Sequence, residues 1–212
     1  MATTTEDIPG VILAGGLSSR MGEDKARIRL GGVCLLDRAA RRLAPQVSAL
    51  AVNANGPVLF AEGEELPVFA DLDTARAGPL GGILAALDHA GKHHPGASHV
   101  ATVPIDSPFF PADLVARLAR AADGPERIVA ARSAGGLHPV FALWPVALAG
   151  DLAAWLAGGG ALRVRSYLER HQAREVAFSP VETPRGQLDP FFNINTPDDL
   201  AAAENWLWIL ER

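Results

Sequence analysis

Short apolar runs alternate with longer amphipathic stretches along most of the chain. The apolar runs predict β-strands over residues 11–14, 49–55, 66–71, 99–106, 127–132, 138–145 and 174–178. Apolar positions at helical spacing predict helices over residues 35–45, 78–91, 111–124, 146–157 and 161–171. Strands that alternate with helices favour an α/β protein with an open, mostly parallel sheet and helices on both faces.

The end of the chain predicts a short strand, a turn and a helix. In "FFNINTPDDLAAAENWLWIL", residues 191–210, Thr196 is the predicted N-cap and Pro197 the first helical residue. Asn193 and Asn195 alternate within "FNIN". Because successive side chains of a strand point to opposite faces, we expect both amides on one face.

Chemically distinctive residues follow three of the predicted strands. A glycine-rich loop follows residues 11–14, Asp71 ends the strand over 66–71, and Asp106 ends the strand over 99–106. In open α/β sheets, ligands bind beyond the carboxyl ends of the strands. The sequence therefore predicts a ligand site at this edge of the sheet.

The glycine-rich loop combines backbone freedom with two fixed positive charges. It reads "LAGGLSSRMGEDK", residues 13–25, and carries Arg20 and Lys25. Glycines let backbone N–H groups approach phosphate oxygens, and a cationic side chain completes the neutralisation. The Walker pattern fails because two acidic residues separate Gly22 from Lys25, and the dinucleotide fingerprint fails because two glycines are adjacent. Taken alone, the loop is compatible with a phosphate site or with a solvated surface loop.

Composition and charge exclude several classes of protein. The 212 residues are 49% hydrophobic and 20% charged, with a net charge of −5, which argues against disorder and against nucleic-acid or polybasic membrane binding. Cys34 is the one cysteine, which excludes an intrachain disulfide or a thiolate metal cluster. The sequence predicts a single domain over residues 1–212, with residues 1–8 as a flexible N-terminus. Since no long apolar run or signal peptide is apparent, we expect a cytoplasmic protein.

An ordered set of motifs extends this picture over nearly the whole chain. "LAGGLSSRMGEDKARIRLGG" is followed in order by "GPLGGI", "VPIDSPF", "HPVFAL" and "NINTPDDL". This set, from about residue 10 to residue 200, resembles the molybdenum cofactor guanylyltransferase family. The resemblance implies a Rossmann-like nucleotidyltransferase fold. It also implies that the terminal phosphate of Mo-molybdopterin attacks the α-phosphorus of GTP, releasing pyrophosphate and forming molybdopterin guanine dinucleotide.

The resemblance also implies roles for individual residues. Lys25 and Arg20 neutralise the triphosphate and the leaving pyrophosphate, and Asp106 holds Mg²⁺, or Mn²⁺, beside it. Asn193 and Asn195 lie on the molybdopterin side, with ordinary loop anchoring as the alternative for Asn195. The residues implied to contact GTP are Leu13, Ala14, Gly15, Gly16, Lys25, Asn53, Asp71, Gly81, Gly82 and Asp106.

Several of these assignments have alternatives from the residues themselves. Asp73 competes with Asp71, and Asn55 with Asn53, because turns commonly contain such residues. The paired glycines at the start of the 78–91 helix have close packing against the sheet as an alternative to ligand approach. His138 is a further candidate for the border of the acceptor pocket, with a structural role as its alternative. The histidines at positions 93, 94 and 99 are expected to be solvated.

Two other functions stay open at this point. One is a related cytidylyl- or sugar-nucleotide transferase with the same loop, and the other is a catalytically silent nucleotide-binding module. The expected partners are small-molecule substrates, without nucleic acid or membrane, in a monomer or weak homo-oligomer. The resemblance leaves room for proteins that deliver molybdopterin or receive the finished cofactor.

Overall fold

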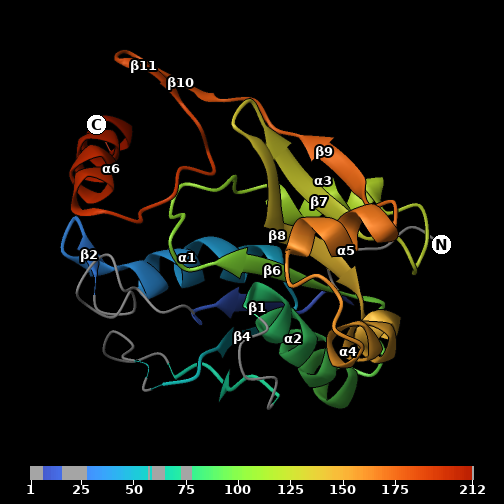
Figure 1. Cartoon of the computed structure of the whole chain (residues 1–212). Coiled ribbons are helices and arrows are strands. Elements are labelled where there is room, and N and C mark those ends of the chain that lie inside the picture. Colours follow the sequence, from blue (N-terminus) through green and yellow to red (C-terminus); the bar gives the residue numbers. More distant parts are fainter. Residues whose placement is uncertain (1–6, 16–27, 57, 59–64, 73–77, 212) are drawn as a thin grey trace.

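A computed structural model describes residues 7–15, 28–56, 58, 65–72 and 78–211. Its centre is a seven-stranded sheet in the order β5-β4-β1-β6-β8-β7-β9 (Figure 1). The strands of this sheet are β1 (Gly10–Leu13), β4 (Leu50–Asn53), β5 (Val68–Phe69), β6 (His99–Pro104), β7 (Val129–Ser133), β8 (Gly136–Pro145) and β9 (Arg174–Ala177). Two hairpins pair β2 (Arg29–Leu30) with β3 (Val33–Cys34), and β10 (Val181–Thr183) with β11 (Gly186–Leu188).

The sheet is mixed and mostly parallel. Strands β5, β4, β1 and β6 are parallel neighbours, and so are β7 and β9. Strand β8 runs antiparallel to both of its neighbours, β6 and β7. The predicted α/β class with a mostly parallel sheet is confirmed, and β8 adds an antiparallel insertion that places its starting residues beside the end of β6.

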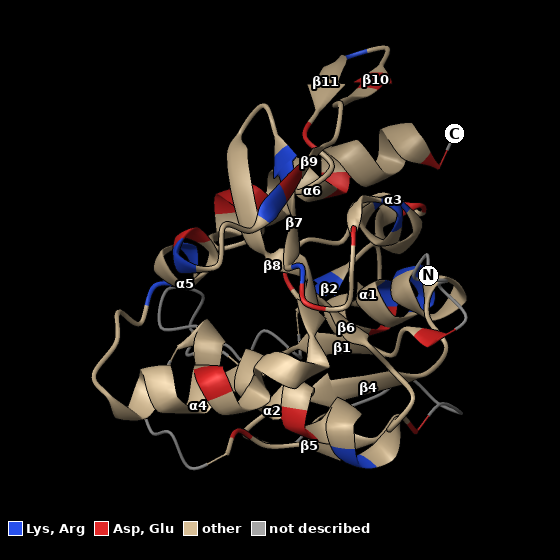
Figure 2. Ribbon diagram, turned by 90° about the vertical axis from the view of Figure 1, so that its right-hand side faces the viewer, with Lys and Arg blue, Asp and Glu red and all other residues tan. Residues whose placement is uncertain are grey.

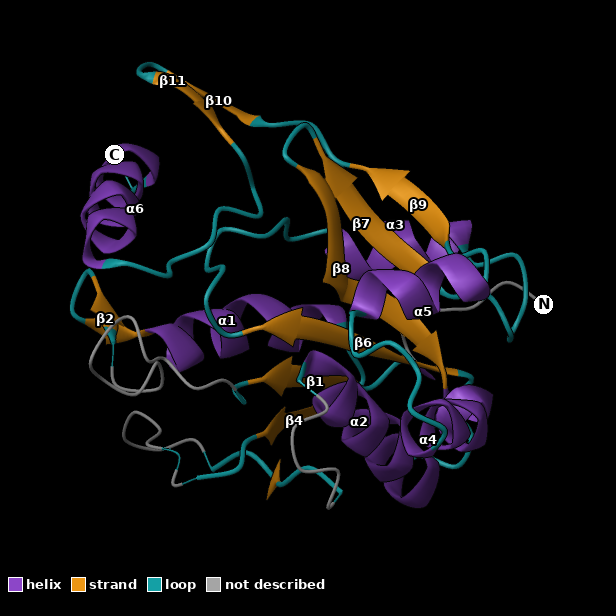
Figure 3. Cartoon of the chain, in the orientation of Figure 1, coloured by secondary structure: helices purple, strands orange, loops and turns teal. Residues whose placement is uncertain are grey.

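Helices cover both faces of the sheet, as predicted (Figure 3). The helices are α1 (Leu35–Leu43), α2 (Pro79–His93), α3 (Leu114–Ala121), α4 (Ala149–Ala157), α5 (Val164–Arg170) and α6 (Pro197–Leu210). Ile12 packs in one core with residues of α1, α3 and α6, whereas Val11 and Leu13 pack in the other with residues of α2, α4 and α5. This alternation along β1 follows from the two-residue period of a strand and gives the central strand two buried faces.

The charged side chains are spread over the surface, and the N-terminal segment packs against the rest of the protein from Ile8 onward. Lys or Arg and Asp or Glu are interspersed over the helices around the sheet (Figure 2). Ile8, which the sequence placed in a flexible N-terminus, is fully buried, and its carbonyl accepts a hydrogen bond from the Ser48 N–H. Within the described residues, no helix is both long and apolar enough to cross a membrane.

The C-terminal prediction is half right. Thr196 caps α6 in a capping box with Asp199, and Pro197 is the first helical residue, as predicted. The predicted strand over "FNIN" is wrong, because residues 192–195 form a loop without strand pairing. A hydrogen bond to the loop after β6 holds this segment instead, because the Ile194 N–H donates to the carbonyl oxygen of Asp106.

Candidate active site

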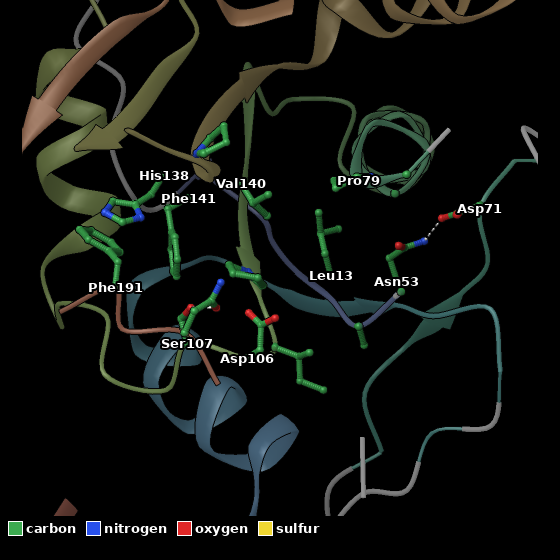
Figure 4. A pocket seen from close by; sticks show the side chains of 18 of the residues that line it. Leu13, Asn53, Asp71, Pro79, Asp106, Ser107, His138, Val140, Phe141 and Phe191 are labelled. Atoms are coloured by element: carbon green, nitrogen blue, oxygen red, sulfur yellow. Dashed lines mark hydrogen bonds between the residues drawn. The ribbon is translucent and has the colours of Figure 1, made fainter. Parts of the chain in front are cut away.

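A pocket of about 460 Å³ opens beyond the carboxyl ends of β1, β4 and β6. Figure 4 shows Asn53 and Asp71 at one end of it, His138 and Phe191 at the other, and Asp106 with Ser107 between them. The predicted edge of the sheet is therefore where the pocket lies. Its lining includes seven of the predicted GTP contacts, Leu13, Ala14, Gly15, Asn53, Asp71, Gly82 and Asp106.

Two amides and one carboxylate form a closed hydrogen-bond network at the first end. Asn53 Nδ2 donates to Asp71 Oδ1 at 3.0 Å, and Asn55 Nδ2 donates to Asp71 Oδ2 at 2.9 Å. The Asp71 N–H in turn donates to Asn55 Oδ1 at 2.8 Å. Asn55, which the sequence offered as the competitor of Asn53, is thus a partner of the same network. We refer to Asn53, Asn55 and Asp71 as the amide end.

Gly82 is required by the amide end itself. A Cβ atom at Gly82 would lie 2.6 Å from Asn53 Oδ1, and the Asn53 side chain is only 1% exposed and hydrogen-bonded to Asp71. This contact supports the close-packing interpretation of that glycine. Gly81 is buried but does not line the pocket. The structure therefore does not bring Gly81 to the site that the sequence assigned to it.

Asp106 lies between the two ends of the pocket. It follows β6 by two residues, since the strand ends at Pro104 rather than at Asp106 as predicted. Its carboxylate lines the pocket, and Oδ1 is buried. An oxygen ligand of this kind suits a hard divalent cation that takes its remaining ligands from phosphates and water.

Of the two predicted acceptor-side asparagines, the structure brings one to the pocket. Asn193 lines it and accepts a hydrogen bond from Ser107 Oγ at 2.6 Å through Oδ1. Asn195 does not line it, and its N–H donates to Asp199 Oδ2 at 3.0 Å at the start of α6. The expectation of two amides on one face fails because the segment is a loop.

Aromatic rings form the other end of the pocket. The ring of His138 stacks on Phe191 with centroids 4.4 Å apart, and Phe141 lies 4.7 Å from Phe191. Burial lowers the pKa of His138 from its usual value, so the imidazole is neutral at pH 7. We refer to His138, Phe141 and Phe191 as the aromatic end. The sequence offered His138 as a candidate but gave no signal for the two phenylalanines.

Three of the predicted site residues lie outside the described part of the chain. They are Gly16, Arg20 and Lys25. Their roles stay predictions from the sequence. Among the histidines expected to be solvated, His99 is instead fully buried at the start of β6, where its Nε2 lies 3.2 Å from the Arg127 carbonyl oxygen.

Known proteins share both the sequence and the fold. Residues 10–176 match the family model of the MobA-like NTP transferase domain. The molybdenum cofactor guanylyltransferase of Rhizobium meliloti (strain 1021) is 52% identical over 203 residues, which cover 96% of this chain and 93% of that protein.

Solved structures with lower identity show the fold alone. The molybdopterin-guanine dinucleotide biosynthesis protein A of Archaeoglobus fulgidus has a TM-score of 0.69 at 22% identity, covering 95% of this chain and 99% of that chain. Rv0371C of Mycobacterium tuberculosis H37Rv, crystallised in complex with manganese, has a TM-score of 0.66 at 20% identity, with coverages of 94% and 98%. The 2-C-methyl-D-erythritol 4-phosphate cytidylyltransferase of Thermus thermophilus has a TM-score of 0.65 at 15% identity, with coverages of 96% and 100%. This fold is thus shared by enzymes named for different nucleotides. The nucleotide that this chain uses is therefore inferred from relatives that match it over nearly its whole length, and not from the fold. By its family model and its 52% identical relative, the chain belongs to the MobA-like NTP transferase family, among the molybdenum cofactor guanylyltransferases.

Proposed function

We propose that this enzyme transfers GMP from GTP to the terminal phosphate of Mo-molybdopterin. A phosphate oxygen of the acceptor forms a bond to the α-phosphorus, the bond between that phosphorus and the bridging oxygen to the β-phosphorus breaks, and pyrophosphate leaves. The products are molybdopterin guanine dinucleotide and pyrophosphate. One observation carries the identity of the substrates, namely the 52% identity to a named guanylyltransferase over 96% of the chain.

The geometry of the pocket supports a reaction between two different substrates. The amide end offers carboxylate, amide and backbone groups, whereas the aromatic end offers flat rings. GTP at the amide end and molybdopterin at the aromatic end would meet near Asp106. Two anionic substrates repel each other, so the protein contributes by positioning them and by neutralising charge.

Asp106 is the proposed ligand of Mg²⁺, with Mn²⁺ as the alternative. In the described part of the chain, no group of three or more His, Cys, Asp or Glu side chains could hold a metal ion. An ion at Asp106 would therefore depend on triphosphate oxygens and water for its other ligands, which is the usual arrangement for Mg²⁺. When bound there, the ion would neutralise charge on the reacting phosphates.

The remaining roles rest on the sequence. Lys25 is proposed at the triphosphate and Arg20 at the leaving pyrophosphate, with Gly16 in the backbone cradle. We also propose a single cytoplasmic domain that acts as a monomer or weak homo-oligomer. Proteins that deliver molybdopterin or receive the dinucleotide are compatible with this function.

An assay with each nucleotide tests the proposal. The purified protein is incubated with Mg²⁺, Mo-molybdopterin and GTP, CTP or UTP, and dinucleotide and pyrophosphate are both quantified. We expect both products in equal amounts with GTP and little of either with CTP or UTP. A preference for CTP would indicate a cytidylyltransferase, and GTP binding without pyrophosphate release would indicate a silent nucleotide-binding module.

A further inference from the structure

A partly buried hydrogen-bond chain leads from the C-terminal segment of the protein to the aromatic end of the pocket. Ser133, the last residue of β7, donates through Oγ to Asp189 Oδ2 at 2.5 Å. The same Oγ lies 2.7 Å from Nε2 of His138, near the start of β8. Ser133 is 8% exposed, so solvent has little access to the middle of this chain.

The direction of each hydrogen bond follows from proton counting. A serine hydroxyl has one proton, and here it goes to Asp189, whose carboxylate accepts. The Gly135 N–H also donates to Ser133 Oγ, at 3.0 Å. Because Oγ has no second proton to give, the contact with His138 requires that Nε2 carry the hydrogen and donate. The neutral imidazole therefore keeps an unprotonated Nδ1.

The carboxylate of Asp189, where this series of hydrogen bonds begins, is also fixed in position. Asp189 Oδ1 accepts from the Phe191 N–H at 2.9 Å, which leaves Oδ2 for Ser133. The hydrogen bond from the Phe191 N–H also links Asp189 to the residue whose ring stacks on His138. One short segment thus sets both the position of the His138 ring and its tautomer.

We propose that Asp189 and Ser133 hold His138 as the Nε2–H tautomer, so that Nδ1 accepts a hydrogen bond from an N–H group of the pterin ring of the acceptor substrate. In the described part of the chain, Nδ1 makes no hydrogen bond, and His138 lines the pocket. A flat heterocycle with ring N–H and amino donors matches both this acceptor and the neighbouring rings. Asp189 and Ser133 are positioning residues in this arrangement, and His138 is the residue that touches the substrate.

Guanine has similar donors, and the assignment of the aromatic end to the pterin rests on the proposed function. Asp71 at the amide end presents the complementary carboxylate, and it lies across the pocket from His138 with Asp106 between them (Figure 4). A reaction centre at Asp106 needs one substrate on each side. With GTP at the amide end, the aromatic end is left for the acceptor.

Replacing Asp189 with asparagine reverses the direction of the hydrogen bonds through Ser133 to His138, while the side chain keeps nearly the same shape. The Phe191 N–H still requires an acceptor, so the amide oxygen stays there and the NH₂ group faces Ser133. The amide then donates to Oγ, the serine proton turns to His138 Nε2, and the hydrogen of the imidazole moves to Nδ1. The N–H at Nδ1 of His138 then faces an N–H of the pterin, so the hydrogen bond between them is lost.

The first measurement is made on the free protein and does not depend on turnover. Imidazole ¹⁵N spectra at pH 8 report the tautomer, and His138→Phe identifies the His138 signals by their loss. We expect Nε2–H in the wild type and Nδ1–H in Asp189→Asn. An Nδ1–H form or an equal mixture in the wild type would overturn the proposal. If Asp189→Asn does not fold, Ser133→Ala serves instead, and a wild-type-like single tautomer in that variant would overturn the proposal too.

The second measurement separates the two substrates. In Asp189→Asn we expect the KM for Mo-molybdopterin to rise about tenfold, with the KM for GTP unchanged, because a lost or reversed hydrogen bond costs about that factor. His138→Phe, which keeps a stacking ring, should show the same split, and Asp113→Asn, an exposed carboxylate outside the pocket, should show none. A rise in the KM for GTP alone would place guanine at the aromatic end and overturn the assignment. Failure of the wild type to form dinucleotide would count against the proposed function, while the tautomer result would stand by itself.

Discussion

The two ends of the pocket are built by different physical means. At the amide end, Asn53, Asn55 and Asp71 hold one another through three hydrogen bonds of 2.8–3.0 Å. At the aromatic end, stacking fixes the rings of His138 and Phe191, 4.4 Å apart. A directional polar network suits one defined arrangement of donors and acceptors, whereas stacked rings suit the flat face of a heterocycle.

This difference indicates how one site can serve two anionic substrates. In the proposed arrangement, each end binds a different substrate away from its reacting phosphate. Asp106 belongs to neither end and lies between them. We therefore expect substitutions at the ends to act on the binding of one substrate each, and a substitution at Asp106 to act on the reaction itself.

The largest effect is expected at the shared centre. Asp106→Ala should lower kcat by about 10²–10³-fold, since removal of a preorganised electrostatic group commonly costs that much. The measurement is turnover against Mg²⁺ concentration, with a melting curve to establish folding. The control is Asp113→Asn, which changes an exposed carboxylate seven residues further on. Wild-type turnover of Asp106→Ala at limiting Mg²⁺ would remove Asp106 from the proposed metal site.

The next largest effect is expected at the amide end, where a substitution should change the KM for GTP alone. Gly82→Ala places a methyl group only 2.6 Å from Asn53 Oδ1, so the Asn53 side chain must move and we expect its hydrogen bond to Asp71 to be lost. The KM for GTP should rise about tenfold, as expected when a buried hydrogen bond is broken. The KM for Mo-molybdopterin should not change.

Helix α2 supplies a matched control for that variant. At Gly91 a Cβ atom meets only Val146 Cγ1, at 3.6 Å, which is an ordinary contact. Gly91→Ala should therefore keep both KM values and gain up to about 1 kcal/mol of stability from helix propensity. Equal kinetic effects of the two alanines would mean that Asn53 is not the cause.

A smaller effect is expected where Asn193 meets Ser107. Loss of the 2.6 Å hydrogen bond in Asn193→Ala should raise the KM for Mo-molybdopterin by about three- to tenfold. Asn195→Ala should change it less, because Asn195 does not line the pocket. Steady-state kinetics of both single variants provides the comparison, and an equal or larger effect at Asn195 would restore the paired site predicted from the sequence.

The smallest effect concerns β6, the strand that precedes Asp106. Burial lowers the pKa of His99 below its usual value, so the folded protein holds it neutral while the unfolded chain protonates near pH 6.5. This stability is fully present above about pH 6.5 and is lost as the pH falls through the folded-state pKa, with a slope of at most about 1.4 kcal/mol per pH unit. Urea unfolding between pH 5 and pH 8 measures it. His99→Gln should flatten the curve, and an unchanged curve would assign the dependence to His89 and His138, whose pKa values burial also lowers.

The sequence predicted the amide end better than the aromatic end, for a physical reason. Strand β1 and Asp71 follow from local apolar runs and from the rule that parallel strands end at one edge. Only the resemblance to the family favours Asn53 over Asn55. The chain from Asp189 to Ser133 joins residues 56 positions apart, and no local period records such a contact. The same limit explains "FNIN", where alternating residues predicted a strand but no neighbouring strand was available to pair with it.

One experiment can test both ends of the pocket together. The KM values for GTP and for Mo-molybdopterin are measured for the wild type, Gly82→Ala and His138→Phe under identical Mg²⁺. We expect a crossed result, in which Gly82→Ala raises only the KM for GTP and His138→Phe raises only the KM for Mo-molybdopterin. If both variants raised the same KM, or if each raised both equally, the two ends of the pocket would not bind separate substrates.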